Sequence, residues 1–510
     1  MQNRQHAEPT ERNVRMTTVQ PAQSSHATEP TNAVELESLL TAAQSAAAPL
    51  AALRPAERAS LLDAVAESLD AAADRLVPLA QAETHLPEGR LRGELKRTTF
   101  QLRLFGELLR DGGFLDARID HADPEWPMGA PRPDLRRVRV PLGPVVVFAA
   151  SNFPFAFSVA GGDTASALAA GCPVLLKAHS GHLGLSRLTG EVVATSLAEA
   201  GAPEGTFGLI VGTDAGASAL RDPRVAAGAF TGSIPGGRAL FDIASSRPVP
   251  IPFYGELGSN NPVFVTEAAA AERGAEIAEA FVGSFTLGAG QFCTKPGTLV
   301  VPAGSGMVAA LRDAALPPAA QLLNERIQAG YTEVLGGLES HPRLEVLAQG
   351  PDPLADPPSP TLLLTTVADM LVEPHALQAE CFGPTAVVVA YDDESQLVPL
   401  AESFEGQLTA TIHGTDTCDV AGLAEVLTRK AGRVLWNQWP TGVSVTYAQQ
   451  HGGPYPATTA VTSTSVGTAA IDRFLRPVAY QGFPQHLLPE ALREENPLGV
   501  PRLVDGKREG

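Results

Sequence analysis

The sequence predicts an α/β protein in which helices cover both faces of a parallel sheet. Short apolar, β-branched runs alternate with helical segments between residues 144 and 265, and this alternation is typical of βαβ units. Ligands bind such sheets outside the carboxyl ends of the strands. The length of 510 residues further predicts more than one domain.

The individual elements follow from residue spacing along the chain. Apolar residues recur every three or four positions over residues 33–109, which predicts helices, and Arg and Val alternate at 137–140, which predicts a half-exposed strand. The first α/β region is expected to hold strands at 144–150, 173–178, 206–211, 228–231, 249–254 and 262–265, with helices at 158–170, 183–200, 214–220 and 236–244. The second region, from about residue 267, is expected to hold a helix to about 285, strands at 298–301 and 385–390, and an edge strand at 473–480.

The composition narrows the class of partner. A formal net charge of -19 argues against nucleic acid or an anionic membrane surface, and no apolar run is long enough to span a bilayer. Residues 1–31 are polar and lack the apolar core of a secretory signal, so they are expected to form a disordered tail. Four scattered cysteines indicate free thiols in a reducing cytoplasm, and without a metal-binding motif no metal is expected.

Cys293 is the candidate nucleophile. It lies in the glycine-punctuated segment GAGQFCT, after a predicted helix and before a predicted strand, and flanking glycines let a backbone approach a ligand closely. Most single cysteines are small buried hydrophobes, which is the interpretation for Cys172, Cys381 and Cys418. Only Cys293 has the context expected of a thiolate presented to a pocket.

Asn152 and Glu256 are further candidates, because each follows or ends a predicted parallel strand where ligands bind. A turn asparagine that bonds its own backbone explains Asn152 equally well. Glu256 lies in an apolar, glycine-flanked segment, and burial there is expected to raise its pKa toward that of a general base. The turn at Gly232 and Ser233 fits neither a P-loop nor GxGxxG, but its amides and the helix that follows suit a pyrophosphate.

Several motifs together resemble the aldehyde dehydrogenase superfamily. In the family's order, over about residues 35–485, they are SNFPF at 151–155, LLKAH at 175–179, FTGS at 230–233, ELG at 256–258, GQFC at 290–293 and ECFGP at 380–384. The resemblance implies an α/β aldehyde dehydrogenase fold with a Rossmann-like cofactor domain, an α/β catalytic domain and a small β oligomerisation element.

The resemblance also implies catalytic roles. Cys293 would attack the aldehyde, the Asn152 amide and the Cys293 N–H would hold the oxyanion, and Glu256 would activate water to hydrolyse the thioester. The segment HGGPYPAT at 451–458 replaces the family's usual glycine-rich motif. In the branch that the chain resembles, His451 would lie near the thiol, where an imidazole is expected to lower the thiol pKa.

For the cofactor, the resemblance implies ribose contacts from Lys177 and Glu380, pyrophosphate contacts from Gly232 and Ser233, and a nicotinamide contact from Phe382. The family's usual acid after this lysine, which disfavours a ribose 2'-phosphate, is replaced by Ala178, His179 and Ser180. His179 and Ser180 are expected to donate to that phosphate. NADP is therefore the expected cofactor, with NAD also accepted.

Segments such as GDTASALAAGCP at 162–173 and FLRPVAYQ at 474–481 are similar to one NADP-preferring branch of the family. That branch contains 2-oxoglutarate semialdehyde (2,5-dioxovalerate) dehydrogenases, with a bacterial long-chain fatty aldehyde dehydrogenase nearby. The expected reaction is the oxidation of 2-oxoglutarate semialdehyde to 2-oxoglutarate. Medium or long-chain fatty aldehydes are the alternative substrates. A CoA-acylating enzyme is less expected, because such relatives usually lack the glutamate base that Glu256 would provide. A catalytically silent scaffold is also less expected, because it would not need Cys293, Asn152 and Glu256 together.

The resemblance also predicts the domains and the assembly. The NAD(P)-binding domain is expected at 32–120 and 141–257, the catalytic domain at 258–450, oligomerisation strands at 121–140 and 465–490, and a C-terminal tail at 491–510. The protein is expected to be a homodimer or homotetramer that acts on a small-molecule aldehyde.

Overall fold

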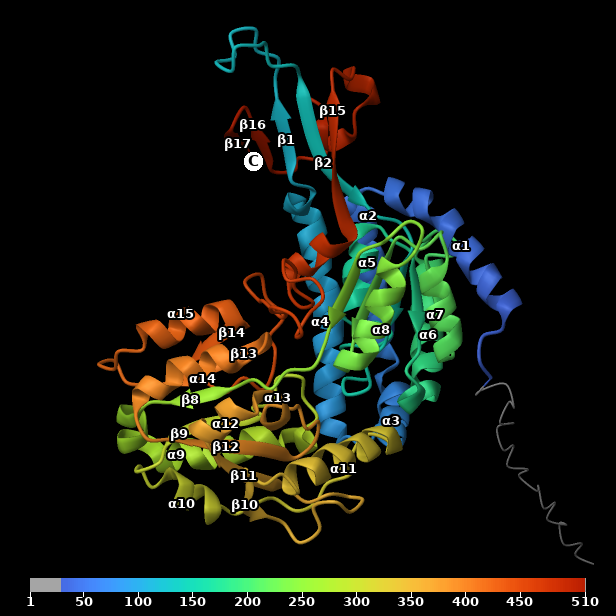
Figure 1. The fold of residues 1–510 in the computed structure, drawn as a ribbon. Coiled ribbons are helices and arrows are strands. Elements are labelled where there is room, and N and C mark those ends of the chain that lie inside the picture. The colour runs from blue at the N-terminus through green and yellow to red at the C-terminus, as the bar shows by residue number, and fades with distance from the viewer. Residues whose placement is uncertain (1–28, 510) are drawn as a thin grey trace, which may run out of the picture.

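The computed structural model describes residues 29–509 and forms three sheets. Figure 1 shows two α/β lobes and a narrow β extension that projects away from both of them. The predicted disordered tail lies almost wholly outside the described residues. Where it enters them, the Thr31 N–H donates to the carbonyl of Val211 at 2.9 Å. Within residues 29–509 no helix is long and apolar enough to cross a membrane.

The first sheet is entirely parallel, with the order β5-β4-β3-β6-β7. The chain runs outward from β3 to β5 and then returns to the other side of β3 to form β6. The order therefore reverses between β3 and β6, and a crevice for a ligand is expected at the carboxyl ends of these two strands. The strands are β3 Val145–Phe148, β4 Val174–Lys177, β5 Phe207–Ile210, β6 Ala227–Thr231 and β7 Phe253–Glu256.

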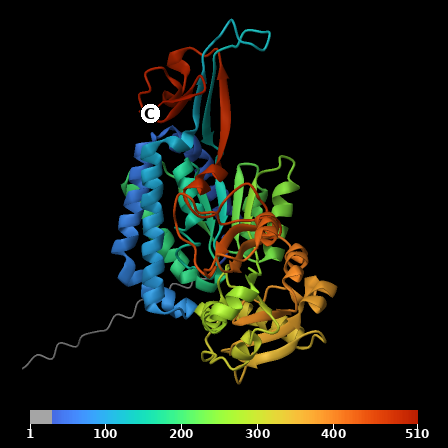
Figure 2. The ribbon, with the colours of Figure 1, turned by 90° about the vertical axis from the view of Figure 1, so that its left-hand side faces the viewer.

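Helices cover both faces of this sheet, and Figure 2 shows the N-terminal helices stacked along one side of the molecule. The first helix starts at a capping box. The side chain of Asn32 accepts from the backbone N–H of Glu35, and the side chain of Glu35 accepts from the backbone N–H of Asn32. The helices are α1 Ala33–Ala52, α2 Pro55–Ala71, α3 Ala73–Thr84, α4 Glu88–Asp111, α5 Gly162–Ala170, α6 Leu183–Glu199, α7 Thr213–Arg221 and α8 Ile234–Ser245.

The second sheet has the order β10-β11-β12-β9-β8-β13-β14 and is parallel apart from β10. The run at 262–265, which the sequence placed at the end of the first region, is β8 of this sheet, so the chain crosses between lobes after residue 256. The strands are β8 Val263–Val265, β9 Thr298–Pro302, β10 Glu345–Gln349, β11 Thr361–Thr366, β12 Thr385–Tyr391, β13 Gln407–His413 and β14 Ala431–Trp436. The helices are α9 Glu267–Thr286, α10 Met307–Arg312, α11 Glu325–Glu339, α12 Val367–Val372, α13 Pro374–Leu377, α14 Leu397–Ser403 and α15 Ala421–Lys430.

The third sheet forms the β extension, with the order β15-β2-β1-β16-β17. The predicted strand at 473–480 is observed as β15 at one edge. The last two strands correct the expectation of a C-terminal tail over 491–510. Residues 491–509 are ordered because Leu492 and Val500 are buried in the main core and Asp505 binds His121 and Arg132. The strands are β1 Ala117–Asp120, β2 Leu135–Pro141, β15 Leu475–Gln481, β16 Arg502–Val504 and β17 Lys507–Glu509.

Candidate active site

Cys293 lies in the short loop between a turn of 3-10 helix at Leu287–Gly290 and strand β9, and its side chain is half-buried. The loop is held against the segment before β12. Gly290 has a φ of 68°, and a Cβ at this position would lie 2.0 Å from the carbonyl oxygen of Gly383. Glycine is therefore required here, because any side chain would push the nucleophile loop off its support.

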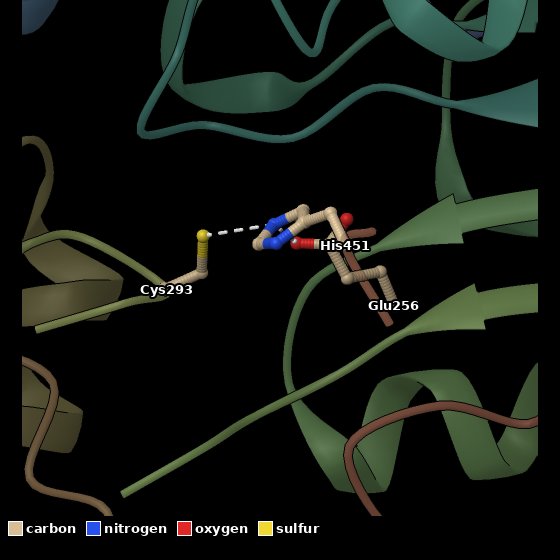
Figure 3. Close-up of side chains that lie close together, drawn as sticks. All are labelled: Glu256, Cys293 and His451. Atoms are coloured by element: carbon tan, nitrogen blue, oxygen red, sulfur yellow. Dashed lines mark hydrogen bonds and ion pairs between the residues drawn. The ribbon is translucent and has the colours of Figure 1, made fainter. Parts of the chain in front are cut away.

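Glu256 and His451 complete a cluster with this thiol. The Sγ of Cys293 lies 3.5 Å from Nε2 of His451, and the same nitrogen lies 2.7 Å from Oε1 of Glu256. Figure 3 shows the three side chains converging from separate segments of the chain. Glu256 is the last residue of β7, and His451 comes from the long loop after β14. Nucleophile, imidazole and carboxylate thus lie together, as proton transfer from a thiol requires.

The His451 loop is fixed to the end of β7. Its backbone N–H donates to Thr464 Oγ1 at 2.8 Å, and its carbonyl accepts from the Ser465 N–H at 2.8 Å. The Ser465 hydroxyl also donates a short hydrogen bond to Oε2 of Glu256. Thr458 also pairs with Glu256 as an antiparallel bridge, which ties the loop to the end of the strand.

The pKa shifts at this cluster differ from both sequence predictions. Burial raises the pKa of the Cys293 thiol well above its ordinary value, and the negative charge of Glu256 raises it further. Burial also acts to raise the pKa of Glu256, but attraction to His451 and the hydrogen bonds at the carboxylate outweigh it, so this pKa is lowered. The prediction of a raised Glu256 pKa was therefore wrong, as was that of a thiol pKa lowered by the imidazole. Glu256 is already ionised while the thiol holds its proton.

The same fold gathers three atoms that could also ligate a metal. The sequence predicted no metal because it contains no metal-binding motif. The structure brings one ligand atom each from Glu256, Cys293 and His451 to within 4.8 Å of one another. Those atoms are also the ones that acid–base chemistry at the thiol would use.

Asn152 follows β3, at the carboxyl end of the sheet, and is buried. Its side-chain amide donates to the carbonyl of Gln291 at 3.1 Å, which places it beside the nucleophile loop. One N–H of this amide remains for a substrate. Within the described chain the backbone N–H of Cys293 forms no hydrogen bond either, so both donors expected to hold an oxyanion are available.

Aromatic rings line one side of this region. Phe153 packs edge-on against Phe157 and Phe292, with 5.3 Å between ring centroids in each pair. The guanidinium of Arg90 lies over two of these rings, 5.1 Å from the centroid of Phe153 and 4.8 Å from that of Phe292. Arg90 also donates to the carbonyl of Asn152 at 2.8 Å. One side of the thiol region is thus apolar, with the guanidinium of Arg90 at its border.

The predicted ribose contacts lie at the end of β4. Lys177 is half-buried there, and Ser180 is exposed. His179 caps the next turn, because its Nδ1 accepts from the N–H of Gly181 at 3.0 Å. Burial lowers the pKa of His179 to about 3, so it stays neutral and has only its Nε2–H to donate. Sequence reasoning missed Arg326, at the start of α11, whose charge acts on both Lys177 and His179.

The turn after β6 opens helix α8. Ser233 is its N-cap and accepts from the N–H of Gly236 at 3.3 Å, and both Gly232 and Ser233 are exposed. Exposed amides at a helix N-terminus favour an anion. Glu380 and Phe382 lie in the segment before β12. A Cβ on Gly258 would lie 2.2 Å from Oε2 of Glu380, so the carboxyl group closely approaches the chain that links the two lobes.

Several residues of the site left no signal in the sequence. Arg97 and Ser465 are single polar residues without a motif, and only the fold brings them to the cluster. Asn261 did have a signal, because it lies in the SNNP segment beside the ELG motif. Its side chain donates to the carbonyl groups of Cys293 and Lys295 at 2.9 Å each, which ties the nucleophile loop to the chain that enters β8.

Comparison with known proteins identifies the family to which this chain belongs. The sequence profile of the aldehyde dehydrogenase family matches residues 8–324 and 345–475. The chain belongs to the aldehyde dehydrogenase family, and the predicted fold class is confirmed. It is 48% identical to alpha-ketoglutaric semialdehyde dehydrogenase 2 of Azospirillum brasilense over 472 residues, 91% of this chain and 89% of that protein. It is 46% identical to alpha-ketoglutaric semialdehyde dehydrogenase of Acinetobacter baylyi, over 88% of this chain and 87% of that protein.

Solved structures agree on the fold. Aldehyde dehydrogenase C of Pseudomonas syringae, a mutant complexed with NAD+ and octanal, has a TM-score of 0.73 at 20% identity, covering 90% of both chains. An NADP-dependent enzyme of Escherichia coli has a TM-score of 0.72 at 23% identity, covering 88% of this chain and 90% of that one. The protein is an oxidoreductase that acts on an aldehyde with a nicotinamide dinucleotide, NAD or NADP.

Proposed function

We propose that this enzyme oxidises 2-oxoglutarate semialdehyde to 2-oxoglutarate with NADP and releases the product by hydrolysis. The observation that carries the reaction type is the Cys293, His451 and Glu256 cluster, with 3.5 Å and 2.7 Å between neighbouring reactive atoms. The substrate rests on the two relatives that are 48% and 46% identical over most of both chains, each named for this semialdehyde.

In the first half of the reaction Cys293 attacks the aldehyde carbon and forms a thiohemiacetal. The thiol proton has a short route to Nε2 of His451 or to the ionised Glu256. The negative charge that develops on oxygen is held by the Asn152 amide and the Cys293 N–H. One such donor is typically worth about 2.7–4 kcal/mol in a transition state.

Loss of a hydride from the thiohemiacetal carbon, which a bound nicotinamide dinucleotide would accept, leaves the acyl group on Cys293 as a thioester. In the second half water must attack this thioester. Glu256 is ionised at neutral pH and so accepts a proton from that water. Ser465 donates to one of its oxygens and fixes the carboxylate's direction. A base already in place favours hydrolysis over transfer of the acyl group to CoA.

The residues present fit a nicotinamide dinucleotide, which would supply the hydride acceptor. Lys177 at the end of β4 and the exposed start of α8 at Ser233 lie where such sheets bind pyrophosphate and ribose. Glu380, from the other lobe, approaches the start of α8, because a Cβ on Gly258 would lie near both Glu380 and Ile234. Its carboxyl is held beside Gly258, and burial raises its pKa to about 7. Phe382 is the half-buried aromatic residue that would pack against the nicotinamide.

The preference for NADP is supported by the charges near Lys177. The charge of Arg326 acts on Lys177 and on His179, and a 2'-phosphate would meet two cations there. One acid, Glu83, lies at the start of α6. Its carboxylate is already used, because it accepts from the N–H groups of Gly184 and Leu185 at 2.9 and 2.8 Å. Ser180 and the Nε2–H of His179 complete the set of donors.

The assembly is proposed to be a homo-oligomer formed through the β extension. Strand β15 lies at the edge of its sheet and pairs only with β2 among residues 29–509. An unpaired edge is a ready site for strand addition by a second copy. Sedimentation of the purified protein tests this proposal, and a monomer would contradict it.

The substrate test follows reduced nicotinamide at about 340 nm. Purified enzyme is given 2-oxoglutarate semialdehyde, hexanal or decanal, with NADP or NAD, and with or without CoA. We expect the highest kcat/KM with 2-oxoglutarate semialdehyde and NADP, and no effect of CoA. Higher kcat/KM with decanal would favour the fatty aldehyde alternative, which the phenylalanine-lined wall would suit. Strict dependence on CoA would contradict hydrolysis.

Cys293→Ala provides the matching test of the nucleophile. We expect no detectable oxidation but unchanged NADP affinity, because the thiol contributes to chemistry and not to the nucleotide contacts. Cys418→Ala is the control, since Cys418 is a free cysteine elsewhere whose Sγ donates to the carbonyl of Thr415. Turnover by Cys293→Ala would place the nucleophile at another residue.

A further inference from the structure

Three arginines surround the thiol region without a carboxylate partner. They are Arg90 and Arg97 on α4 and Arg433 on β14. Each has one buried N–H group with no hydrogen-bond partner, and within residues 29–509 none forms an ion pair. Burying an unpaired guanidinium is costly, so an anion that arrives from outside the protein would be strongly favoured here.

Arg97 has the longest hydrogen bonds of the three. Its Nε and Nη2 reach only the carbonyl of Val443, each at 3.4 Å, and its Nη1 has no partner. Arg433 donates to backbone carbonyls in three bonds of 2.8–3.1 Å. Arg90 is bonded to Asn152 and stacked between two aromatic rings. Arg97 has only its two 3.4 Å bonds to Val443, so its donor groups are the most weakly held of the three and can turn to a ligand.

Arg97 also faces the reacting groups. Its Cζ lies 5.3 Å from the ring centroid of Phe157, and the ring of His451 lies 6.3 Å from the same centroid. Its charge acts on both Cys293 and Glu256. The guanidinium and the imidazole that contacts the thiol thus lie near the same ring, that of Phe157.

The local charges leave room for one more anion. Glu94 lies on the same face of α4 as Arg90 and Arg97, at spacings of four and three residues. Its Oε1 accepts from the N–H groups of Phe155 and Ala156 at 2.8 and 3.0 Å, and its Oε2 has no hydrogen-bond partner. Burial raises the pKa of Glu94, so Glu94 and Glu256 together provide at most two negative charges against three arginines.

We propose that Arg97 binds the substrate's carboxylate and so selects semialdehydes that carry one. This inference rests on the proposed function, because it assigns the carboxylate end of that same substrate. An extended five-carbon semialdehyde places its carboxylate carbon about 5 Å from its aldehyde carbon, across four carbon–carbon bonds. With the aldehyde at Cys293, the carboxylate reaches along the Phe157 wall. A guanidinium with free N–H groups binds a carboxylate through two parallel hydrogen bonds.

The test compares Arg97→Met and Arg97→Lys with the wild-type enzyme on 2-oxoglutarate semialdehyde and on pentanal, which has the same chain length and no charge. For Arg97→Met we expect kcat/KM on the semialdehyde to fall about 10- to 100-fold, mainly through KM, and kcat/KM on pentanal to change little. Arg97→Lys should recover part of the loss. Arg103→Met is the control, because Arg103 lies on the same helix and pairs with Asp70 at the surface.

The two proposals fail in different ways. If wild-type enzyme oxidises pentanal as efficiently as 2-oxoglutarate semialdehyde, the proposed substrate is wrong and no carboxylate site is needed. If wild type prefers the semialdehyde and Arg97→Met keeps that preference, only the role of Arg97 is overturned. An equal loss on both substrates would also overturn it, since that pattern indicates general damage.

A binding structure keeps the inference testable even if Arg97→Met folds poorly. Cys293→Ala enzyme crystallised with 2-oxoglutarate should show one carboxylate within hydrogen-bonding distance of the Arg97 guanidinium. A carboxylate bound to Arg433 or Arg90 instead would contradict the assignment.

Discussion

Nε2 of His451 lies 2.7 Å from Oε1 of Glu256, whereas Nδ1 of the same ring is buried without a hydrogen-bond partner. A single ring nitrogen therefore faces both the carboxylate and the thiol. A proton that leaves Cys293 does not cross the imidazole from one nitrogen to the other, because all three groups meet at Nε2. His451 and Glu256 act together as one acceptor, and the charge on Glu256 dominates the electrostatics at the thiol.

The first prediction concerns the pH dependence of thiol reactivity. Burial and the charge of Glu256 both raise the pKa of Cys293, so alkylation by iodoacetamide should speed up at a pH above the ordinary thiol pKa of about 8.5. Glu256→Gln removes the negative charge that opposes the thiolate. The alkylation profile of this variant should therefore move to lower pH by about one unit. An unmoved or higher profile would show that Glu256 does not act on the thiol.

The second prediction separates the two halves of the reaction. Glu256→Gln should release one equivalent of NADPH per active site in a burst, followed by steady turnover about 100-fold or more below wild type, because thioester hydrolysis has lost its base. Stopped-flow absorbance measures both phases. Undiminished steady turnover would exclude Glu256 as an essential base. Glu279→Gln, on the exposed side of α9, is the control for the loss of an acid.

The third prediction concerns the support of the nucleophile loop. Gly290→Ala should lower the free energy of unfolding by about 2 kcal/mol or more and abolish activity, because a Cβ there meets the Gly383 carbonyl at a positive φ. Gly283→Ala is the control. Gly283 is a helical residue of α9, and a methyl group added there would meet no atom within 4 Å, so the change should stabilise by about 0.5–1 kcal/mol. Denaturant titration measures both, and similar effects of the two changes would contradict the prediction.

The fourth prediction concerns the nucleotide. Arg326→Met should raise KM for NADP about 10-fold and leave KM for NAD unchanged, because only NADP carries the phosphate that this charge would meet. Arg312→Met is the control, since Arg312 pairs with Glu345 away from the first lobe. Equal changes in KM for both nucleotides would indicate that Arg326 does not read the 2'-phosphate.

The α/β class and the strands of the first sheet could be predicted from the sequence within a few residues, because buried parallel strands are apolar and separated by helices of regular spacing. The motifs also predicted that Cys293, Glu256 and His451 lie together. They did not predict the charges there. Whether a buried carboxylate is ionised depends on partners such as Ser465, which lies 209 residues along the chain from Glu256.

Two further features could not be predicted, because the local sequence carries no signal for either of them. Strands β16 and β17 are three residues each, too short to show an alternating pattern, and β17 is wholly charged. Arg97 lies in a helix whose pattern is amphipathic, where an arginine is normally solvent-exposed. Only the packing of α4 against the loop at Val443 turns this side chain toward the thiol.

The β extension also has a consequence for biosynthesis. Strand β1 pairs in parallel with β16, Ala117 with Arg502, and β2 pairs with β15, Leu135 with Gln481. Strands β1 and β2 leave the ribosome long before the partners that flank them on either side. Until then the hairpin they form has two bare edges, and bare edges recruit strands from other chains. Nascent chains halted before residue 475 should therefore aggregate through this hairpin, because the strands that protect it, β15 and β16, are translated later.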